Sequence, residues 1–81
     1  MLQARVYVTL KSGVLDPQGK AVKSALVSLG FKGLNDVRVG KYFEINIDEV
    51  SKETALKKIK EMCEKLLANT VIENYRVEIV E

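Results

Sequence analysis

Apolar and polar positions alternate along the chain from Leu2 to Leu10. The odd positions from Gln3 to Thr9 are polar or amphipathic, and alternation of this kind is typical of a β-strand with one buried face. We therefore predict a first strand over Leu2–Leu10. Its buried face would carry the even positions Leu2, Ala4, Val6, Val8 and Leu10.

The spacing of apolar residues then changes to that of a helix. Asp16 supplies an N-cap oxygen, and Pro17 suits the first helical position because it needs no backbone donor. Gly30 is expected to end this helix in a left-handed conformation, with Phe31 folded back toward Leu26 in a Schellman-type cap. The apolar face of the helix would be formed by Ala21, Val22, Ala25, Leu26 and Leu29.

A β-hairpin is predicted over residues 34–47, because its apolar residues all fall on odd positions. A two-residue loop would put them on opposite faces, whereas a three-residue loop from Gly40 to Tyr42 keeps them on one face. We therefore expect the three-residue loop. The residues that share this face are Val37, Val39, Phe43, Ile45 and Ile47.

The last third of the chain predicts a second helix and a final strand. Ser51 is a suitable N-cap, and Asn69 is expected to end the helix. The strand Tyr75–Val80 would turn Tyr75, Val77 and Ile79 to one face. The apolar stripe of the helix consists of Ala55, Leu56, Ile59, Met62, Cys63 and Leu66.

The order of these elements predicts one ferredoxin-like domain over residues 1–81. This is an α+β fold, βαββαβ, in which two helices cover one face of a four-stranded antiparallel sheet. The other face would be bare, with free edge strands, and a domain of this size often gains stability by pairing. We expect a homodimer or homotetramer that uses Arg5, Tyr7, Thr9, Glu44 and Asn46, on a bare face that also holds Arg38, Arg76 and Glu78.

Composition adds mainly exclusions. Thirteen Lys and Arg against 11 Asp and Glu give a net charge of +2, too even for a dedicated nucleic-acid binder. The absence of histidine removes the commonest general base, and no phosphate-binding glycine spacing occurs. A lone cysteine, Cys63, indicates core packing and a cytoplasmic setting. We expect no catalytic residue, no metal site, no bound cofactor, no signal peptide and no membrane segment.

Two alternatives share the predicted topology. An RNA-recognition module stacks bases on aromatic residues of its central strands, but only Tyr7 is well placed for this, because the hairpin puts Tyr42 in the turn. A small-ligand regulatory module is the other alternative, although such modules usually accompany a catalytic domain.

Four blocks give the chain a family resemblance: VTLKSGVLDPQGKAV, LGF, VRVGKYFEI and LLANTVIENY. Together they closely resemble the PurS family, the small subunits of phosphoribosylformylglycinamidine synthase in purine biosynthesis. The most specific block is GVLDPQG, from Gly13 to Gly19. One departure is Thr70, where the family usually has proline.

The resemblance implies an adaptor rather than a catalyst. In this family a glutaminase subunit releases ammonia, a large synthetase subunit uses ATP, magnesium and the ammonia derived from glutamine, and the small subunit joins the two. Val14 and Leu15 would then form an apolar docking loop, unless they simply close one end of the core. Arg38 and Lys41 have no evident local role. The partner-binding residues that we predict are Gly13, Val14, Leu15, Asp16, Pro17, Gln18, Arg38, Gly40 and Lys41.

Overall fold

The computed structural model describes all residues 1–81 and has an α+β architecture built on a three-stranded antiparallel sheet. The strands are β1 (Leu2–Leu10), β2 (Lys41–Ile47) and β3 (Glu73–Val80), in the order β2-β1-β3. The helices are α1 (Pro17–Ser28) and α2 (Lys52–Met62), and α2 continues into a π-helical turn, η1 (Cys63–Leu67). The predicted fourth strand is absent, so the four-stranded sheet of a ferredoxin-like fold is a correction to the sequence-based expectation.

The predicted strand alternation is confirmed in β1 and β3. Val6 pairs with Phe43 of β2 on one side and with Val77 of β3 on the other, so the three strands turn their apolar residues to the same face. Ile59 and Cys63 pack on this face and complete the core. The fully buried positions of β1 are its even residues Ala4, Val6 and Val8.

The hairpin predicted over residues 34–47 is wrong. Val37 and Val39 lie outside any strand, and β2 begins at Lys41 and pairs with β1 instead. The reason is a contact with a distant part of the chain, because the backbone N–H of Val39 donates to the carboxylate of Asp16 rather than to a neighbouring strand. Tyr42 is therefore a strand residue opposite Tyr7, and not part of a turn.

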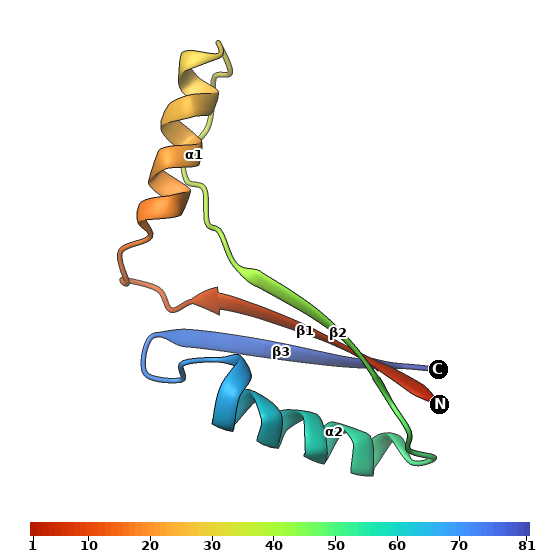
Figure 1. Ribbon diagram of the computed structural model, residues 1–81. Helices are drawn as coiled ribbons and strands as arrows, with labels where there is room; N and C mark the ends of the chain where they lie inside the picture. Colours follow the sequence, from red (N-terminus) through yellow and green to blue (C-terminus); the bar gives the residue numbers. More distant parts are fainter.

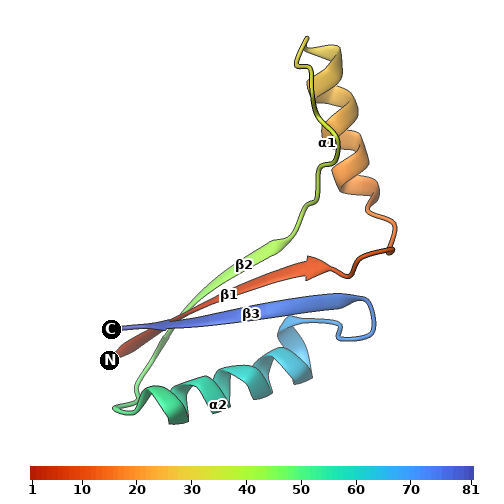
Figure 2. The ribbon, with the colours of Figure 1, turned by 180° about the vertical axis from the view of Figure 1, so that it is seen from behind.

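Helix α1 has the predicted boundaries but not the predicted place. Its Schellman cap is formed, since Phe31 N–H donates to the Leu26 carbonyl and Gly30 N–H to the Val27 carbonyl. Yet α1 stands away from the sheet, and only α2 covers it (Figures 1 and 2). We call residues 17–40, which comprise α1 and the segment returning to β2, the arm. Two helices on one face of the sheet is thus a second correction.

Helix α2 begins as predicted, with the Ser51 hydroxyl accepting from Thr54 N–H. Its predicted stripe is only partly buried. Ala55, Ile59 and Cys63 reach the core, whereas Met62 and Leu66 are exposed. The π-helical turn from Cys63 shifts the phase of the residues that follow, so the simple helical spacing misplaces the last turn. None of the helices is long and apolar enough to cross a membrane.

Candidate functional site

The base of the arm brings together the two sequence blocks that we single out as partner-binding. Residues 11–16 lead from β1 into α1 through a turn in which Val14 N–H donates to the Lys11 carbonyl, and Gly13 has a positive φ of 87°. Val14 is half-buried and Leu15 is 62% exposed, and neither belongs to the core. The alternative in which Val14 and Leu15 close one end of the core is therefore wrong.

Asp16 joins the two limbs of the arm. One carboxylate oxygen accepts from Gly19 N–H at 2.8 Å, which caps α1, and the other accepts from Val39 N–H at 2.9 Å. The residue is only 7% exposed. These backbone hydrogen bonds, first that from Val39 and then that from Gly19, hold the pKa of Asp16 below its ordinary value. The ionised carboxylate of Asp16 therefore does more than cap α1, because it also binds the limb of the arm that returns to β2.

Arg38 lies against the same base. Its Nη2 donates to the carbonyls of Leu10 at 3.1 Å and Lys11 at 3.3 Å, and its Nε lies 3.6 Å from Asp16 Oδ2. Arg38 thus binds the end of β1 to the returning limb of the arm. This side chain does have a local role, contrary to the expectation from sequence.

Lys41 connects the start of β2 to the end of η1 and to the start of β3, the strand at the other edge of the sheet. Its Nζ donates to the Leu67 carbonyl at 3.2 Å and lies 3.7 Å from a carboxylate oxygen of Glu73. Gly40 has no positive φ, so a left-handed backbone conformation is not what requires glycine at this position. Instead, a Cβ at Gly40 would overlap the backbone oxygen of Val8, so the position requires close approach of two backbones.

These residues surround an open hollow between the arm and the sheet. Of the residues predicted to bind a partner, Asp16, Pro17, Gln18, Gly40 and Lys41 line it, as do Leu10, Val39 and Glu73. We call this hollow the base hollow. A second, smaller depression beside it is lined by Val14, Leu15, Asp16, Lys20, Asp36, Val37 and Arg38.

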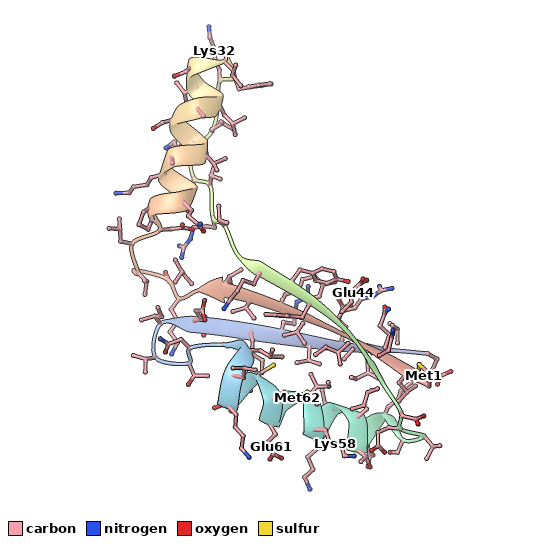
Figure 3. The ribbon with its side chains drawn as sticks, viewed as in Figure 1. Met1, Lys32, Glu44, Lys58, Glu61 and Met62 are labelled. Carbon is pink, nitrogen blue, oxygen red and sulfur yellow. The ribbon has the colours of Figure 1, made fainter.

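The open face of the sheet, opposite α2, carries an aromatic and charged cluster. The rings of Tyr7 and Tyr42 lie 5.0 Å apart, and the Arg76 guanidinium lies 4.2 Å from the Tyr7 ring centre. The Tyr42 hydroxyl donates to Glu44 at 3.0 Å. Glu44 is labelled on this face in Figure 3, with α2 on the other side of the sheet.

Few groups in the structure have the setting of a reactive side chain. The Cys63 thiol is fully buried in the core, and burial raises its pKa above the ordinary value. No three potential ligands among His, Cys, Asp and Glu lie close enough together to hold a metal ion. The Tyr75 hydroxyl donates to Glu64 at 2.7 Å, and this hydrogen bond raises the pKa of Tyr75 to about 12.

Comparison with known proteins gives one consistent result. The family model of PurS, described as phosphoribosylformylglycinamidine (FGAM) synthase, matches residues 3–81. The PurS subunit of that synthase from Bacillus subtilis is 53% identical over 81 residues, covering 100% of this chain and 95% of the relative. The chain belongs to the PurS family. The family is that of a subunit of FGAM synthase in purine biosynthesis, so the resemblance seen in the sequence is confirmed.

Solved PurS structures share the shape of this chain. The B. subtilis PurS structure gives a TM-score of 0.88 and covers 100% of both chains. PurS of Methanocaldococcus jannaschii gives 0.91 at 38% identity, covering 100% of this chain and 98% of its own. A PurLQS structure from Thermotoga maritima gives 0.86 at 30% identity, with 99% of each chain covered.

The residues predicted for self-association also fall together in this PurS fold. Arg5, Tyr7 and Thr9 of β1 and Glu44 and Asn46 of β2 share the open face of the sheet. Sequence reasoning missed the part of Tyr42 in this cluster, because the predicted turn removed it from the strand. It also missed Glu73 in the base hollow, although Glu73 lies within the quoted LLANTVIENY block.

Proposed function

We propose that this PurS family chain is a non-catalytic adaptor that joins the glutaminase subunit to the large synthetase subunit of FGAM synthase and supports ammonia transfer between them. The observation that carries the proposal is the base hollow, where two blocks separated by about twenty residues in sequence line one open surface. The T. maritima PurLQS structure also supports the proposal, because one of its chains is similar to this one.

In this proposal the chemistry belongs to the partner subunits. ATP, magnesium and glutamine act there, this subunit binds no cofactor of its own, and the complex works in the cytoplasm. A buried thiol of raised pKa is a poor nucleophile, which supports an adaptor rather than a catalyst. The side chain best suited to dock is Leu15, because it is exposed beside the two hollows and makes no contribution to the core.

Reconstitution tests the adaptor. We expect no turnover from the isolated chain, and glutamine-dependent amidotransfer only when it is mixed with both larger subunits. Leu15→Asp should leave the fold intact and lower glutamine-dependent turnover at limiting concentration of this subunit, because it places a charge on an apolar docking surface. The matched control is Val50→Asp, at a fully exposed valine beyond β2. Equal glutamine-dependent turnover for both variants would reject the docking role of this loop.

A second proposal concerns the open face of the sheet, where the Tyr7–Tyr42 pair favours contact with another surface. An RNA-recognition module also exposes aromatic pairs, but here the Tyr7 ring is covered by Arg76, and Glu44 and Glu78 would repel phosphates. We infer self-association through this face. Tyr7→Ala should reduce the oligomer mass in sedimentation, whereas salt-sensitive binding of single-stranded RNA would favour the alternative.

A further inference from the structure

The LLANTVIENY block contains a loop that exposes two adjacent apolar side chains. This loop, residues 68–72, joins η1 to β3, and we call it the η1–β3 loop. Val71 is 81% exposed and Ile72 is 39% exposed, and neither belongs to the core. A single exposed valine is common on protein surfaces, whereas two apolar neighbours on a loop of fixed conformation favour a contact surface.

Hydrogen bonds within the chain fix the conformation of the η1–β3 loop. The Asn69 carbonyl accepts from Ile72 N–H at 3.0 Å and from Glu73 N–H at 2.7 Å. The Asn69 side chain accepts from Val71 N–H at 3.2 Å, and the Glu73 carboxylate accepts from Asn69 N–H at 2.6 Å. The two apolar side chains therefore stand on a preorganised loop, which lowers the entropy that ordering the loop would cost on binding.

The η1–β3 loop is attached to the same end of the sheet as the base of the arm. Lys11 N–H, just after β1, donates to the Ile72 carbonyl at 2.8 Å. Glu73 lies 3.7 Å from Lys41 Nζ, and both residues line the base hollow. The arm leaves this end of the sheet on one side, whereas η1 and α2 lie on the other (Figures 1 and 2). The chain thus has two apolar loops at this end, one leading into the arm and one following η1.

A polar hollow lies beside the η1–β3 loop. Neither Lys11 nor Glu64 forms an ion pair within the chain. Glu64 accepts from the Tyr75 hydroxyl, which is neutral. The hollow therefore offers one ammonium group and one carboxylate that a partner can pair. Its lining residues are Lys11, Glu64, Thr70, Glu73, Asn74 and Tyr75.

We infer, on the basis of the proposed adaptor function, that the η1–β3 loop and the polar hollow form a second docking surface, which binds the larger subunit that does not dock at Leu15. An adaptor that joins two subunits needs two separate contacts, and the base hollow with Leu15 supplies one. Because both surfaces are at one end of the sheet, two subunits bound there lie next to each other, as transfer of ammonia between them requires.

The chemistry of this surface describes the partner that it fits. Val71 and Ile72 need an apolar depression, since burial of both side chains supplies the non-directional part of the affinity. Lys11 and Glu64 need an acidic and a basic side chain beside that depression, and such charge pairs determine specificity and register more than affinity.

Site-specific photocrosslinking in the reconstituted complex identifies the neighbour of each loop. Benzoylphenylalanine is placed at position 71, 15 or 50 in three separate variants, each mixed with both larger subunits. Position 71 should crosslink to one larger subunit and position 15 to the other. Position 50, a fully exposed valine beyond β2, should crosslink to neither. A crosslink from position 71 to a second copy of this chain, to the subunit reached from position 15, or to no protein overturns the second docking surface.

Val71→Asp tests the same surface by activity. When this subunit is titrated into both larger subunits, the concentration that gives half of the maximal glutamine-dependent turnover should rise roughly tenfold or more, because docking buries the new charge. Val50→Asp is the matched control and should titrate as the wild type does. Val71→Asp should also keep the wild-type circular dichroism spectrum and oligomer mass, and a lower mass would assign the loop to self-association instead.

The titration separates failure of this docking surface from failure of the adaptor function. If the wild-type chain gives no glutamine-dependent turnover with both larger subunits, the adaptor function is wrong, and the second docking surface is wrong with it. If the wild type gives turnover and Val71→Asp titrates like it, only the second docking surface is wrong.

Discussion

The carboxylate of Asp16 accepts a hydrogen bond from the backbone N–H of Val39 at 2.9 Å, across 23 residues of sequence. The same carboxylate caps α1 through Gly19 N–H at 2.8 Å. One side chain therefore fixes where the arm leaves the sheet and where it returns. This explains why the GVLDPQG block precedes α1. A plain turn and a helix cap would be enough for a helix that packed only on its own sheet.

Asp16→Asn should loosen the base of the arm. An amide presents only one acceptor oxygen, so one of the two backbone N–H groups loses its partner and faces an NH₂ group instead. Hydrogen exchange measured by NMR should become faster at the amides of Gly19 and Val39, with little change in β1. Asp36→Asn, at an exposed aspartate of the arm, is the control and should leave both amides protected.

The same carboxylate predicts the behaviour of the protein in acid. Because its pKa is lowered in the folded state, the unfolded chain binds this proton more readily. The stabilisation is complete above the unfolded pKa of about 4, and it is lost as the pH falls through the folded pKa. Urea unfolding should show a gap in stability between wild type and Asp16→Asn that is constant from pH 6 to 5 and narrows below pH 4. Glu61, whose pKa is lowered by Lys65, is present in both proteins and cancels in the comparison.

The sequence predicts those elements of the fold that are determined by residues close together in the chain. β1 follows its alternation because each even residue enters the core, and both helix caps form because Asp16 and Ser51 act on amides three residues away. Val37 and Val39 share the parity of Phe43, but parity does not reveal that the Val39 amide is already bound by Asp16. The absence of the predicted strand therefore results from a long-range contact, which a short sequence pattern cannot predict.

The position of α1 is unpredictable for a related reason. An apolar stripe indicates that a helix face is to be buried, and it does not identify the molecule that buries it. For the candidate site, the sequence identifies the two blocks but not their meeting at the base hollow, since that meeting depends on the arm. It also gives Arg38 no partner, because both carbonyls that Arg38 binds belong to the main chain at the end of β1.

Gly40→Ala should destabilise the subunit more than Gly33→Ala. At Gly40 the new Cβ meets the backbone oxygen of Val8 in the central strand, which has no room to move, and we expect a loss of about 2 to 3 kcal/mol. Gly33 has a φ of 82° and open space around it, so alanine there should cost only the left-handed conformation, about 1 to 2 kcal/mol. Chemical denaturation measures both values. A larger loss at Gly33 would contradict the close approach at Gly40.

Cys63→Ala should lower the free energy of unfolding by about 1 to 2 kcal/mol and leave the reconstituted complex active at permissive temperature, as expected for trimming a small buried group. In the wild type, a thiol reagent should modify Cys63 slowly at neutral pH, since the thiol is buried and its pKa is raised. A cysteine introduced at the exposed Ser24 serves as the fast-reacting control. Loss of glutamine-dependent turnover in a folded Cys63→Ala subunit would instead assign the thiol a function.

The double substitution Arg38→Ala with Lys41→Ala tests whether the base of the arm is also a contact for the larger subunits. Both side chains have partners within the chain, at the carbonyls of Leu10, Lys11 and Leu67, yet both remain partly exposed and Lys41 lines the base hollow. Exposed charge contacts contribute only about 0.2 to 1 kcal/mol each, so single substitutions are expected to be nearly silent.

The double variant should keep the three-stranded sheet folded, weaken salt-dependent binding to the larger subunits, and lower glutamine-dependent turnover more than turnover supplied with ammonium. Only the glutamine-dependent reaction requires the glutaminase to be held in position against the synthetase subunit. Arg38→Lys with Lys41→Arg is the matched control, because it keeps both charges while changing the geometry of each donor. If the double alanine variant binds both subunits normally and retains full glutamine-dependent turnover, the two residues serve only contacts within their own chain and take no part in docking.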